Sequence, residues 1–347
     1  MYTRTYQPSA TPSVHLQRGR VRLQLAGNIF GTVPPVSGVL TTMSRESNIG
    51  WSESDPLHRL PNELILHIFD YVPPREIVKV CRLVCKGWKG FFDDPSFWRL
   101  CMKRRGNYDP RLDRLSGINW TKLCLYTVHN LNLIKSFDSR GNLSLEPWTL
   151  VYTDWDKLIN EHYFREELQL VSRGAVPRQQ RPQGDGGWGI EEWINRHDPG
   201  DQEVLKENSG CENNYVTTST WCCRWQLIDL WDCGFTSEVI NEVKPLIHVS
   251  EWFCAHFDCG SIFTIMVALL DEEFTFLDTY KHSKDMMRAA KGGEWFTVTH
   301  VFQGYRAGVR YVLFADGGRD TDPQGWEVPH GSKMAAARVH ITFSDTR

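Results

Sequence analysis

Residues 60–98 of the chain read LPNELILHIFDYVPPREIVKVCRLVCKGWKGFFDDPSFW, and this stretch sets the character of the N-terminal half. Its second part carries apolar side chains at helical spacing, which places them on one face of one or two helices. These residues are Ile77, Val80, Cys81, Val84, Trp88, Phe91 and Phe92. An earlier apolar stripe consists of Leu64, Ile65, Ile68 and Phe69. The pattern predicts a short helical hairpin or a three-helix unit.

Prolines divide this helical stretch. Pro61 fits the first turn of a helix, where its missing N–H leaves no hydrogen bond unmade. Pro73 and Pro74 are expected to break the chain, and Pro95 is expected to stop the last helix. A unit of only about 45 residues buries a modest share of its surface. We therefore expect another protein to cover part of it.

The composition of the whole chain excludes several classes. With 347 residues the chain is long enough for two or three domains. It carries 39 basic and 42 acidic residues, so neither nucleic acid nor an anionic membrane is the expected partner. No apolar run approaches the length of a membrane span, which predicts a soluble chain. The 10 cysteines occur at irregular spacing, which predicts reduced and mostly buried thiols.

The first 55 residues differ from the remainder. Residues 1–50 contain five arginines and one acidic residue, Glu46, with many Ser, Thr, Gly and Pro and no sustained period. Such a composition cannot bury enough apolar surface to offset the entropy lost on ordering. We expect residues 1–55 to form a disordered leader. Two other interpretations stay open, a mitochondrial transit peptide and an extension ahead of an alternative start at Met43.

A helical connector and a β-rich half follow. Apolar residues continue at helical spacing across residues 111–133, which predicts a stiff helical connector within 104–137. After Gly141 the period changes to two. Alternation is clear at residues 262–269, 296–302, 309–313 and 339–343. Short alternating strands separated by Gly, Pro and Asp indicate an antiparallel sandwich over residues 138–345. Residues 173–200, rich in Arg, Pro, Gln and Gly, are expected to be a mobile surface insertion.

No reaction centre emerges from the motifs. Cys254, His256 and Cys259 have metal-like spacing, but a zinc site needs four ligands and no second pair follows at a matching interval. Cys222 and Cys223 lie in a strand-like stretch, where half-buried thiols are expected rather than a nucleophile. We therefore expect no metal, no cofactor and no catalytic residue in this chain.

The stretch at 60–98 resembles an F-box. The Leu-Pro opening, the spacing to Ile68 and Phe69, the Arg-Leu-Val-Cys run at 82–85 and the two tryptophans carry the resemblance. It implies an F-box over residues 56–103 that docks onto the Skp-type adaptor of an SCF (Skp–cullin–F-box) ubiquitin ligase. Through the adaptor it would meet the cullin scaffold and the RING subunit. The adaptor-binding residues that the resemblance implies are Leu60, Pro61, Leu64, Ile68, Phe69, Val84, Cys85 and Trp88.

The second half resembles the F-box-associated (FBA) domain of the sugar-binding subfamily of F-box proteins. The blocks that carry this are WQLIDLWDCGF at 225–235, PLIHVSEWF at 245–253, DCGS at 258–261 and HVFQGYRAGVRYVLFADGGRD at 300–320. The implied fold is α+β, with helices followed by a ten-stranded antiparallel β-sandwich of the galactose-binding-like jelly-roll type. The implied role is a non-catalytic subunit in the cytoplasm, at the cytosolic face of the endoplasmic reticulum, that presents misfolded high-mannose N-glycoproteins for ubiquitination and degradation.

In that subfamily the sugar site lies in two loops at one end of the sandwich. One loop supplies a phenylalanine, which an ungapped match places at Ser219. The other supplies a Tyr-Trp-Lys run, which falls at Gly325, Trp326 and Glu327. Only Trp326 is retained, and Glu327 replaces a hydrogen-bond donor with an acceptor. Both N-glycoproteins and non-glycosylated proteins therefore stay open as clients.

A carbohydrate-active enzyme is a remote alternative. Glycoside hydrolysis generally needs two carboxylates that flank the scissile bond. The acids available near the second loop are Asp316, Asp320, Asp322 and Glu327. Because acids in turns are usually solvated and not catalytic, we do not expect this chemistry.

Overall fold

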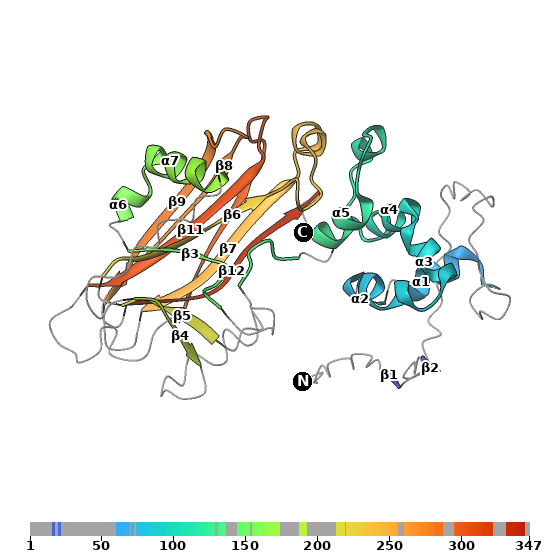
Figure 1. Ribbon diagram of the computed structural model, residues 1–347, viewed down its shortest axis with the longest axis horizontal. Coiled ribbons are helices and arrows are strands. Elements are labelled where there is room, and N and C mark those ends of the chain that lie inside the picture. The colour runs from blue at the N-terminus through green and yellow to red at the C-terminus, as the bar shows by residue number, and fades with distance from the viewer. Residues whose placement is uncertain are drawn as a thin grey trace, which may run out of the picture. The chain divides into compact units, whose positions relative to one another are not determined.

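The computed structural model describes residues 16–17, 20–21, 60–69, 71–72, 74–128, 131–136, 144–152, 155–173, 187–192, 213–218, 220–255, 260–286, 295–321 and 331–343. The chain divides into two units, Met1–Ser47 and Asn48–Arg347. In the first, β1 (Leu16–Gln17) pairs antiparallel with β2 (Arg20–Val21) (Figure 1). The rest of the predicted leader lies outside the described residues. No helix in the described ranges is long and apolar enough to cross a bilayer.

The described residues of the F-box fold into four short α-helices and one 3₁₀ turn. They are α1 (Asn62–Phe69), α2 (Pro74–Lys79), η2 (Cys81–Leu83), α3 (Lys86–Asp93) and α4 (Pro95–Arg104). α3 ends at Asp93, ahead of Pro95 as predicted. Pro95 also opens α4, where the side chain of Asp94 accepts a hydrogen bond from the N–H of Ser96 at 2.8 Å. Pro74 is likewise the first residue of its helix, α2. Proline is favoured at the first helical position, where no backbone N–H is needed.

Aromatic rings form the core of this helical unit. Phe97 lies against Phe91, Phe92 and Trp98 with ring centroids 5.0–5.2 Å apart, all edge to face. The indole N–H of Trp98 donates to the backbone carbonyl of Phe92 at 2.8 Å. Edge-to-face pairs each add about 0.5–1.5 kcal/mol beyond area burial. The predicted apolar stripes therefore supply a packed core even in a unit of this size.

The connector is not one continuous helix. It contains a 3₁₀ helix, η3 (Pro110–Arg114), and α5 (Trp120–Thr127). Gly117 between them has φ +73°, which ends helical geometry, and Asn119 caps α5 by accepting from the N–H of Lys122 at 3.0 Å. The predicted helix over 111–133 is therefore wrong in its middle and at its end, since residues 131–136 are not helical.

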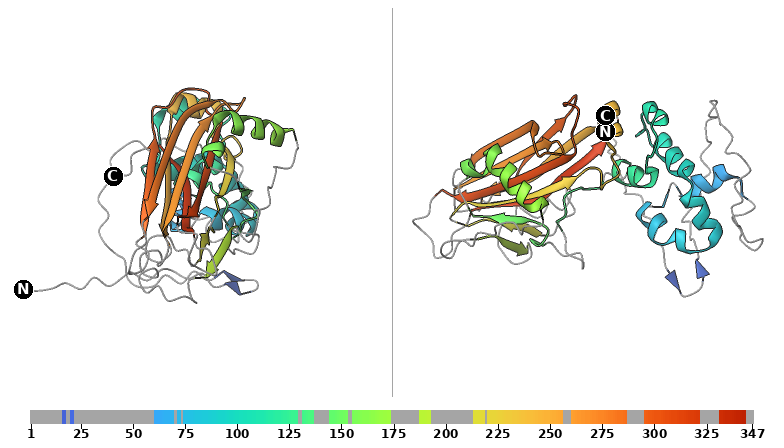
Figure 2. Two further views of the ribbon diagram at one scale, coloured as in Figure 1. Left: turned by 90° about the vertical axis from the view of Figure 1, so that its left-hand side faces the viewer. Right: turned by 45° about the horizontal axis from the view of Figure 1, so that its top comes forward.

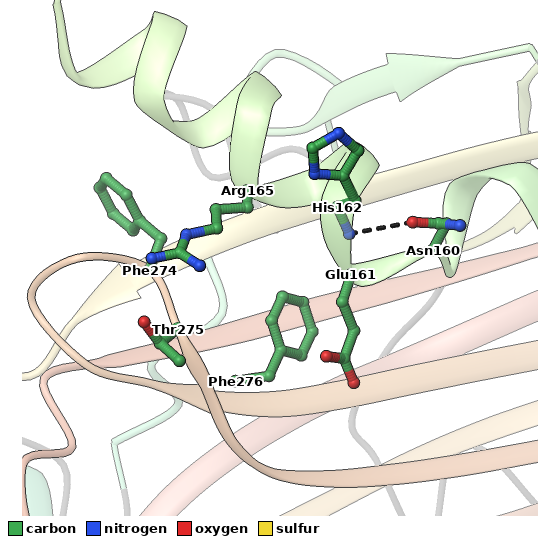
Figure 3. A pocket seen from close by; sticks show the side chains of 7 residues that line it. All are labelled: Asn160, Glu161, His162, Arg165, Phe274, Thr275 and Phe276. Carbon is green, nitrogen blue, oxygen red and sulfur yellow. Dashed lines mark hydrogen bonds between the residues drawn. The ribbon is translucent and has the colours of Figure 1, made fainter.

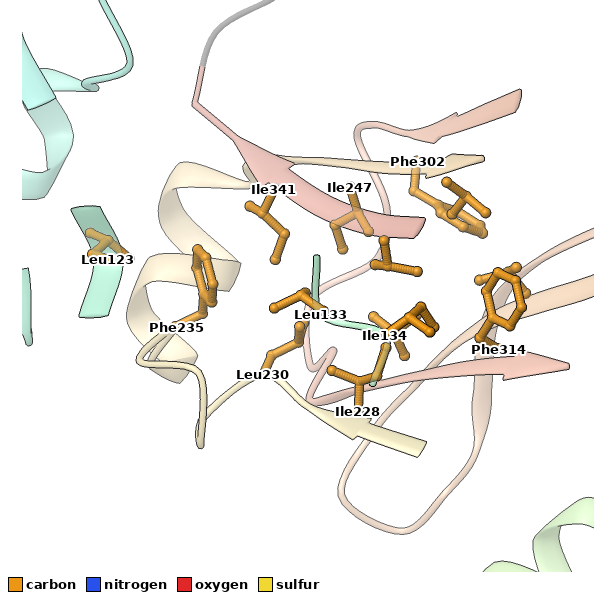
Figure 4. Packing of buried hydrophobic residues seen from close by; sticks show 14 of the residues in the cluster. Leu123, Leu133, Ile134, Ile228, Leu230, Phe235, Ile247, Phe302, Phe314 and Ile341 are labelled. Carbon is orange, nitrogen blue, oxygen red and sulfur yellow. The ribbon is translucent and has the colours of Figure 1, made fainter. Parts of the chain in front are cut away.

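Residues 131–136 enter the sandwich as an extended segment. The N–H of Leu133 donates to the carbonyl of Val339 at 2.8 Å, and the side chain of Asn132 bonds the carbonyl of Ala337 and the N–H of Val339. Leu133 and Ile134 are buried among core residues of both sheets (Figure 4). The connector thus ends as part of the hydrophobic core.

Ten further strands among the described residues build the predicted sandwich. They are β3 (Thr149–Val151), β4 (Gly189–Glu192), β5 (Asn213–Val216), β6 (Cys222–Asp229), β7 (Leu246–Ala255), β8 (Ser261–Leu270), β9 (Phe276–Met286), β10 (Phe296–Phe302), β11 (Tyr311–Asp320) and β12 (Ser332–Thr342). The first sheet has the order β3-β6-β11-β8-β9 and the second sheet β10-β7-β12-β5-β4. Every pairing is antiparallel, so the predicted fold class is confirmed.

Two helices cover the outer face of the first sheet, and neither was predicted. α6 (Trp155–Leu158) and α7 (Glu161–Ser172) bury Trp155, Leu158, Phe164 and Leu168 against residues of β6, β8 and β11 (Figure 2). This helical cover explains why the outward residues of β8, such as Met266 and Ala268, are as apolar as the inward ones.

Part of the predicted insertion at 173–200 is ordered structure. Its residues Gly189–Glu192 form β4, which pairs with β5 at the edge of the second sheet. Residues 174–186 and 193–200 lie outside the described residues. The composition of this segment did not reveal the strand. Its pairing partner, β5, lies more than twenty residues later in the sequence, so a local pattern could not show the pairing.

The described cysteines are free thiols, as predicted. They are Cys81, Cys85, Cys101, Cys124, Cys222, Cys223, Cys233 and Cys254. Cys222 and Cys223 are fully buried rather than half-buried, and burial raises the pKa of the Cys222 thiol. Cys254 is buried beside Trp252, while His256 and Cys259 lie outside the described residues.

Candidate functional site

Exposed apolar side chains concentrate on the F-box. Among the described residues, six large hydrophobic side chains are exposed. Four belong to the F-box: Leu64 (49% exposed), Tyr71 (70%), Leu83 (78%) and Val84 (46%). Exposed apolar groups gathered in one region mark a surface that another protein covers. Tyr71 and Leu83 were missed by the sequence reasoning, which followed only residues on the helical stripe.

The predicted adaptor-binding residues divide by exposure. Pro61, Leu64 and Val84 are exposed, and Leu60, Ile68, Cys85 and Trp88 are half-buried. Phe69 is buried and lies edge to face against Trp88, with ring centroids 5.1 Å apart. The Sγ atom of Cys85 accepts from the N–H of Trp88 at 3.4 Å and caps α3. In this structure Phe69 therefore supports the surface from beneath.

The predicted sugar-site residues Ser219, Gly325, Trp326 and Glu327 lie outside the described residues, but the bases of their two loops are described. The N–H of Gly331 donates to the carbonyl of Thr217 at 2.8 Å, and the N–H of Thr217 donates to the carbonyl of Ser332 at 3.0 Å. The N–H of Asp320 donates to the carbonyl of Thr218 at 3.2 Å. Both loops therefore leave the sandwich side by side, at what we call the loop end.

The loop end has no room for side chains at two glycines. A Cβ on Gly331 would lie 2.3 Å from Oγ1 of Thr217, and one on Gly318 would lie 2.7 Å from the Oγ atom of Ser332. Both glycines thus let the backbones approach closely. These close backbone contacts fix the position of the base of each loop.

An aromatic and cationic row borders the loop end. Trp221 stacks on Trp155 with ring centroids 6.4 Å apart at 24°. The guanidinium carbon of Arg319 lies 5.3 Å from the centroid of the Trp221 ring. Sequence reasoning missed this row, although Trp221 continues the alternation of Cys223 and Trp225 along β6.

A charged cluster lies inside the sandwich, beneath the loop end. Arg224, Glu251 and Asp316 are fully buried, and Arg224 pairs with both carboxylates. Burial raises the pKa of Glu251 well above its ordinary value, and the nearby charge of Asp316 raises it further. Asp316 is thus enclosed and paired, which leaves it unable to serve as a catalytic acid for a bound sugar. Asp320 is also buried.

The connector contacts the opposite end of the sandwich. Arg111 donates from Nη1 to the carbonyl of Glu242 at 2.9 Å and from Nη2 to the carbonyl of Val243 at 3.0 Å. These carbonyls belong to a π-helical turn, η5 (Val239–Val243), and Asp109 pairs with Arg111 at 2.7 Å. Lys122 donates to the carbonyl of Asp232 at 2.8 Å. Since β6 runs from Cys222 at the loop end toward these contacts, loops and connector occupy opposite ends of the strands.

An open cavity of about 400 Å³ also lies away from the loop end, beside the β8–β9 turn (Figure 3). Its lining consists of Asn160, Glu161, His162, Arg165, Phe274, Thr275 and Phe276. Phe274 has φ +60° and is buried against Tyr311. None of the predicted site residues lines it. Across the described ranges, no group of three or more His, Cys, Asp or Glu side chains is placed to hold a metal.

Comparison with known families identifies both halves of the chain. The model of the F-box associated region (FBA) matches residues 124–341, more than half of the chain. The chain belongs to the FBA family. The F-box-like model matches residues 57–102, so an F-box precedes the FBA region as predicted. The FBA match begins within α5, which means that the last part of the connector belongs to the FBA region by sequence as well as by packing.

Relatives align with most of the length of this FBA-family chain. F-box only protein 27 of Macaca fascicularis is 28% identical over 305 residues, which cover 84% of this chain and 94% of the relative. F-box only protein 44 of Homo sapiens is 26% identical over 290 residues, covering 82% and 96%. A solved structure, a family 11 carbohydrate-binding module from Clostridium thermocellum, covers 60% of this chain and 93% of its own at a TM-score of 0.27 and 7% identity.

Proposed function

We propose that this chain is the substrate-recognition subunit of an SCF-type ubiquitin ligase. The F-box would bind a Skp-type adaptor, and the sandwich would hold a client protein at the loop end. The exposed apolar side chains on the F-box carry this proposal, because they remain uncovered in the described part of the isolated chain. Catalysis would belong to the RING subunit and its ubiquitin-conjugating enzyme, and this chain would act by raising the local concentration of the client.

Adaptor binding tests the first half of the proposal. Val84→Asp places a charge on an exposed apolar position, so the fold should persist while binding to a purified Skp-type adaptor falls at least tenfold. Leu170→Asp is the matched control, since Leu170 is 41% exposed on α7 and Val84 is 46% exposed. A pull-down in which both variants retain the adaptor would refute the proposed docking surface.

For the client, we propose N-glycosylated, misfolded proteins, met at the cytosolic face of the endoplasmic reticulum. The bases of the two loops are joined by backbone hydrogen bonds, which suits a ligand that contacts both loops. Trp326 lies in the second of these loops and offers an aromatic face for a pyranose ring. Resemblance to the sugar-binding subfamily supports the same choice.

A non-glycosylated client is the alternative, and the residues Ser219 and Glu327 favour it. Binding of denatured ribonuclease-type glycoproteins, before and after enzymatic removal of the glycan, separates the two. The glycan proposal expects capture only of the glycosylated form and loss of capture in Trp326→Ala. Equal capture of both forms would leave the ligase role intact and replace the glycan by polypeptide as the recognised element.

A further inference from the structure

Arg319 and Trp221 are neighbours across two strands at the loop end. In the register of β11 and β6, Gly317 pairs with Cys223 and Gly318 with Cys222, and Arg319 and Trp221 are the residues that follow this last pair. Paired residues point to the same face of a sheet. The Arg319 guanidinium lies over the Trp221 ring, and that ring stacks on Trp155 from α6. The arginine is therefore held in place by two successive aromatic layers.

The described residues leave hydrogen-bond donors of Arg319 available to a ligand. Arg319 is half-buried and makes no ion pair with any described residue, and its Nε atom is buried without a hydrogen-bond partner. By contrast, Arg310, which directly precedes β11 at its other end, forms an ion pair with Asp229 at 2.9 Å. An arginine presents five N–H donors and no acceptor, so Arg319 suits a ligand rich in acceptor oxygens.

One carboxylate of the first sheet lies on the same face as Arg319. Ile262 pairs with Arg319 on one side and with Asp285 on the other, which places Asp285 on the same face roughly 10 Å from Arg319. Asp320 follows Arg319 in the chain, but it is buried and faces the opposite side of β11. Asp285 shares the face of Arg319, and over this distance salt largely screens its charge. The N–H donors of Arg319 can therefore meet acceptor oxygens of a neutral or an anionic ligand, and the proposed glycan function selects the neutral one.

We infer that Arg319, supported by Trp221, is a sugar-contacting residue that donates hydrogen bonds to the hydroxyl or acetamido carbonyl oxygens of a neutral N-glycan core. This rests on the proposed glycan function and extends that site beyond its two loops, onto the outer face of the first sheet. Trp221 acts as a positioning residue, because Trp155 and Arg319 already occupy its ring.

Titration with N,N′-diacetylchitobiose tests the inference. Arg319→Gln should weaken binding at least fivefold, and Arg319→Lys should weaken it less because it retains a donor. Arg306→Gln, which changes an exposed arginine in the β10–β11 connection, is the matched control and should bind as the wild type does. An arginine Nε–Hε NMR signal, assigned by its absence in Arg319→Gln, should shift during titration of the wild-type chain. If a glutamate hexapeptide shifts this signal and chitobiose does not, Arg319 binds an anionic ligand and the inference is overturned.

The outcomes separate this inference from the function on which it rests. If Trp326→Ala abolishes binding while Arg319→Gln binds within twofold of the wild type, Arg319 makes no contact and the inference fails alone. If Arg319→Gln binds weakly but the wild-type Nε–Hε signal stays unmoved by chitobiose, Arg319 acts only on the fold and the inference also fails. If the wild-type chain binds no chitobiose, the inference and the glycan proposal fall together.

Discussion

Arg224 and Asp316 form a two-point ion pair inside the sandwich. Nε and Nη2 of Arg224 lie 2.7 and 2.8 Å from the two carboxylate oxygens of Asp316, and both side chains are fully buried. The guanidinium carbon is also 3.9 Å from the ring centroids of Trp148 and Tyr215. Removal of one partner from such a pair leaves an uncompensated buried charge.

Asp316→Asn should therefore lower the free energy of unfolding by about 3–5 kcal/mol. Urea denaturation followed by tryptophan fluorescence measures this change. Glu166→Gln serves as control, since Glu166 pairs with His162 on the exposed surface of α7 and should change stability by less than about 0.5 kcal/mol. Equal losses in the two variants would contradict a special role for the buried pair.

Glu251 should make the protein less stable as the pH rises. Burial holds the pKa of Glu251 well above the ordinary value, so the folded chain keeps a proton that the unfolded chain releases once the pH exceeds that ordinary value. Stability then falls with pH, by up to about 1.4 kcal/mol per pH unit, until the folded pKa is reached. Unfolding measured from pH 5 to pH 8 should show this slope.

Glu251→Gln should remove that slope, because glutamine carries no proton to lose and leaves Arg224 paired with Asp316. Its stability near neutral pH should equal or exceed that of the wild type. Glu273→Gln, an exposed change in the β8–β9 turn, should keep the wild-type slope. An unchanged slope in Glu251→Gln would assign the pH dependence to another group.

Arg111 should matter for ubiquitin transfer more than for either binding step. Its two hydrogen bonds join η3 to the carbonyls of Glu242 and Val243, so Arg111→Ala should loosen the connector against the sandwich. Because the side chain is largely exposed, the loss of stability should be only about 1 kcal/mol. Client ubiquitination should slow by roughly threefold or more, since a looser tether lowers the effective concentration of the client.

Arg114→Ala provides the matched control for the connector. Arg114 is exposed on the same 3₁₀ helix, so its removal should leave the ubiquitination rate unaltered. Adaptor pull-down and client capture should be normal in both variants. If Arg111→Ala ubiquitinates its client at the wild-type rate, rigidity of this contact is not required.

Gly331→Ala should damage the loop end. Its Cβ would lie 2.3 Å from Oγ1 of Thr217 and 2.8 Å from the carbonyl of Thr218, so the loop bases must move apart. We expect a loss of about 1–3 kcal/mol in thermal or urea unfolding, together with loss of client capture. Gly304→Ala, at φ +62° with open space around it, should cost about 1 kcal/mol from backbone strain and leave client capture intact.

Local sequence patterns predicted those helices and strands that can be recognised without knowing which other elements pack against them. Alternation at residues 262–269 and 339–343 located β8 and β12, because side chains on a strand face two sides in turn. The same reasoning missed α6 and α7. The role of Trp155, Phe164 and Leu168 as buried helix residues is evident only from the sheet face against which they pack. Sequence reasoning placed the end of a helix before Pro95, as found, but did not predict that Pro95 starts the next helix.

The sequence by itself determined the F-box helices, the antiparallel sandwich and the family, because periodicity and motif spacing are local properties. Tertiary structure alone decided which apolar residues stay exposed, with Leu83 and Val84 outside and Phe69 inside. It also brought Arg224, Glu251 and Asp316 together from three strands, and set Arg319 on Trp221 across a strand pair. Such contacts join residues roughly 30 to 100 positions apart, and they form only when burial of both sheets compensates the entropy of closing those loops.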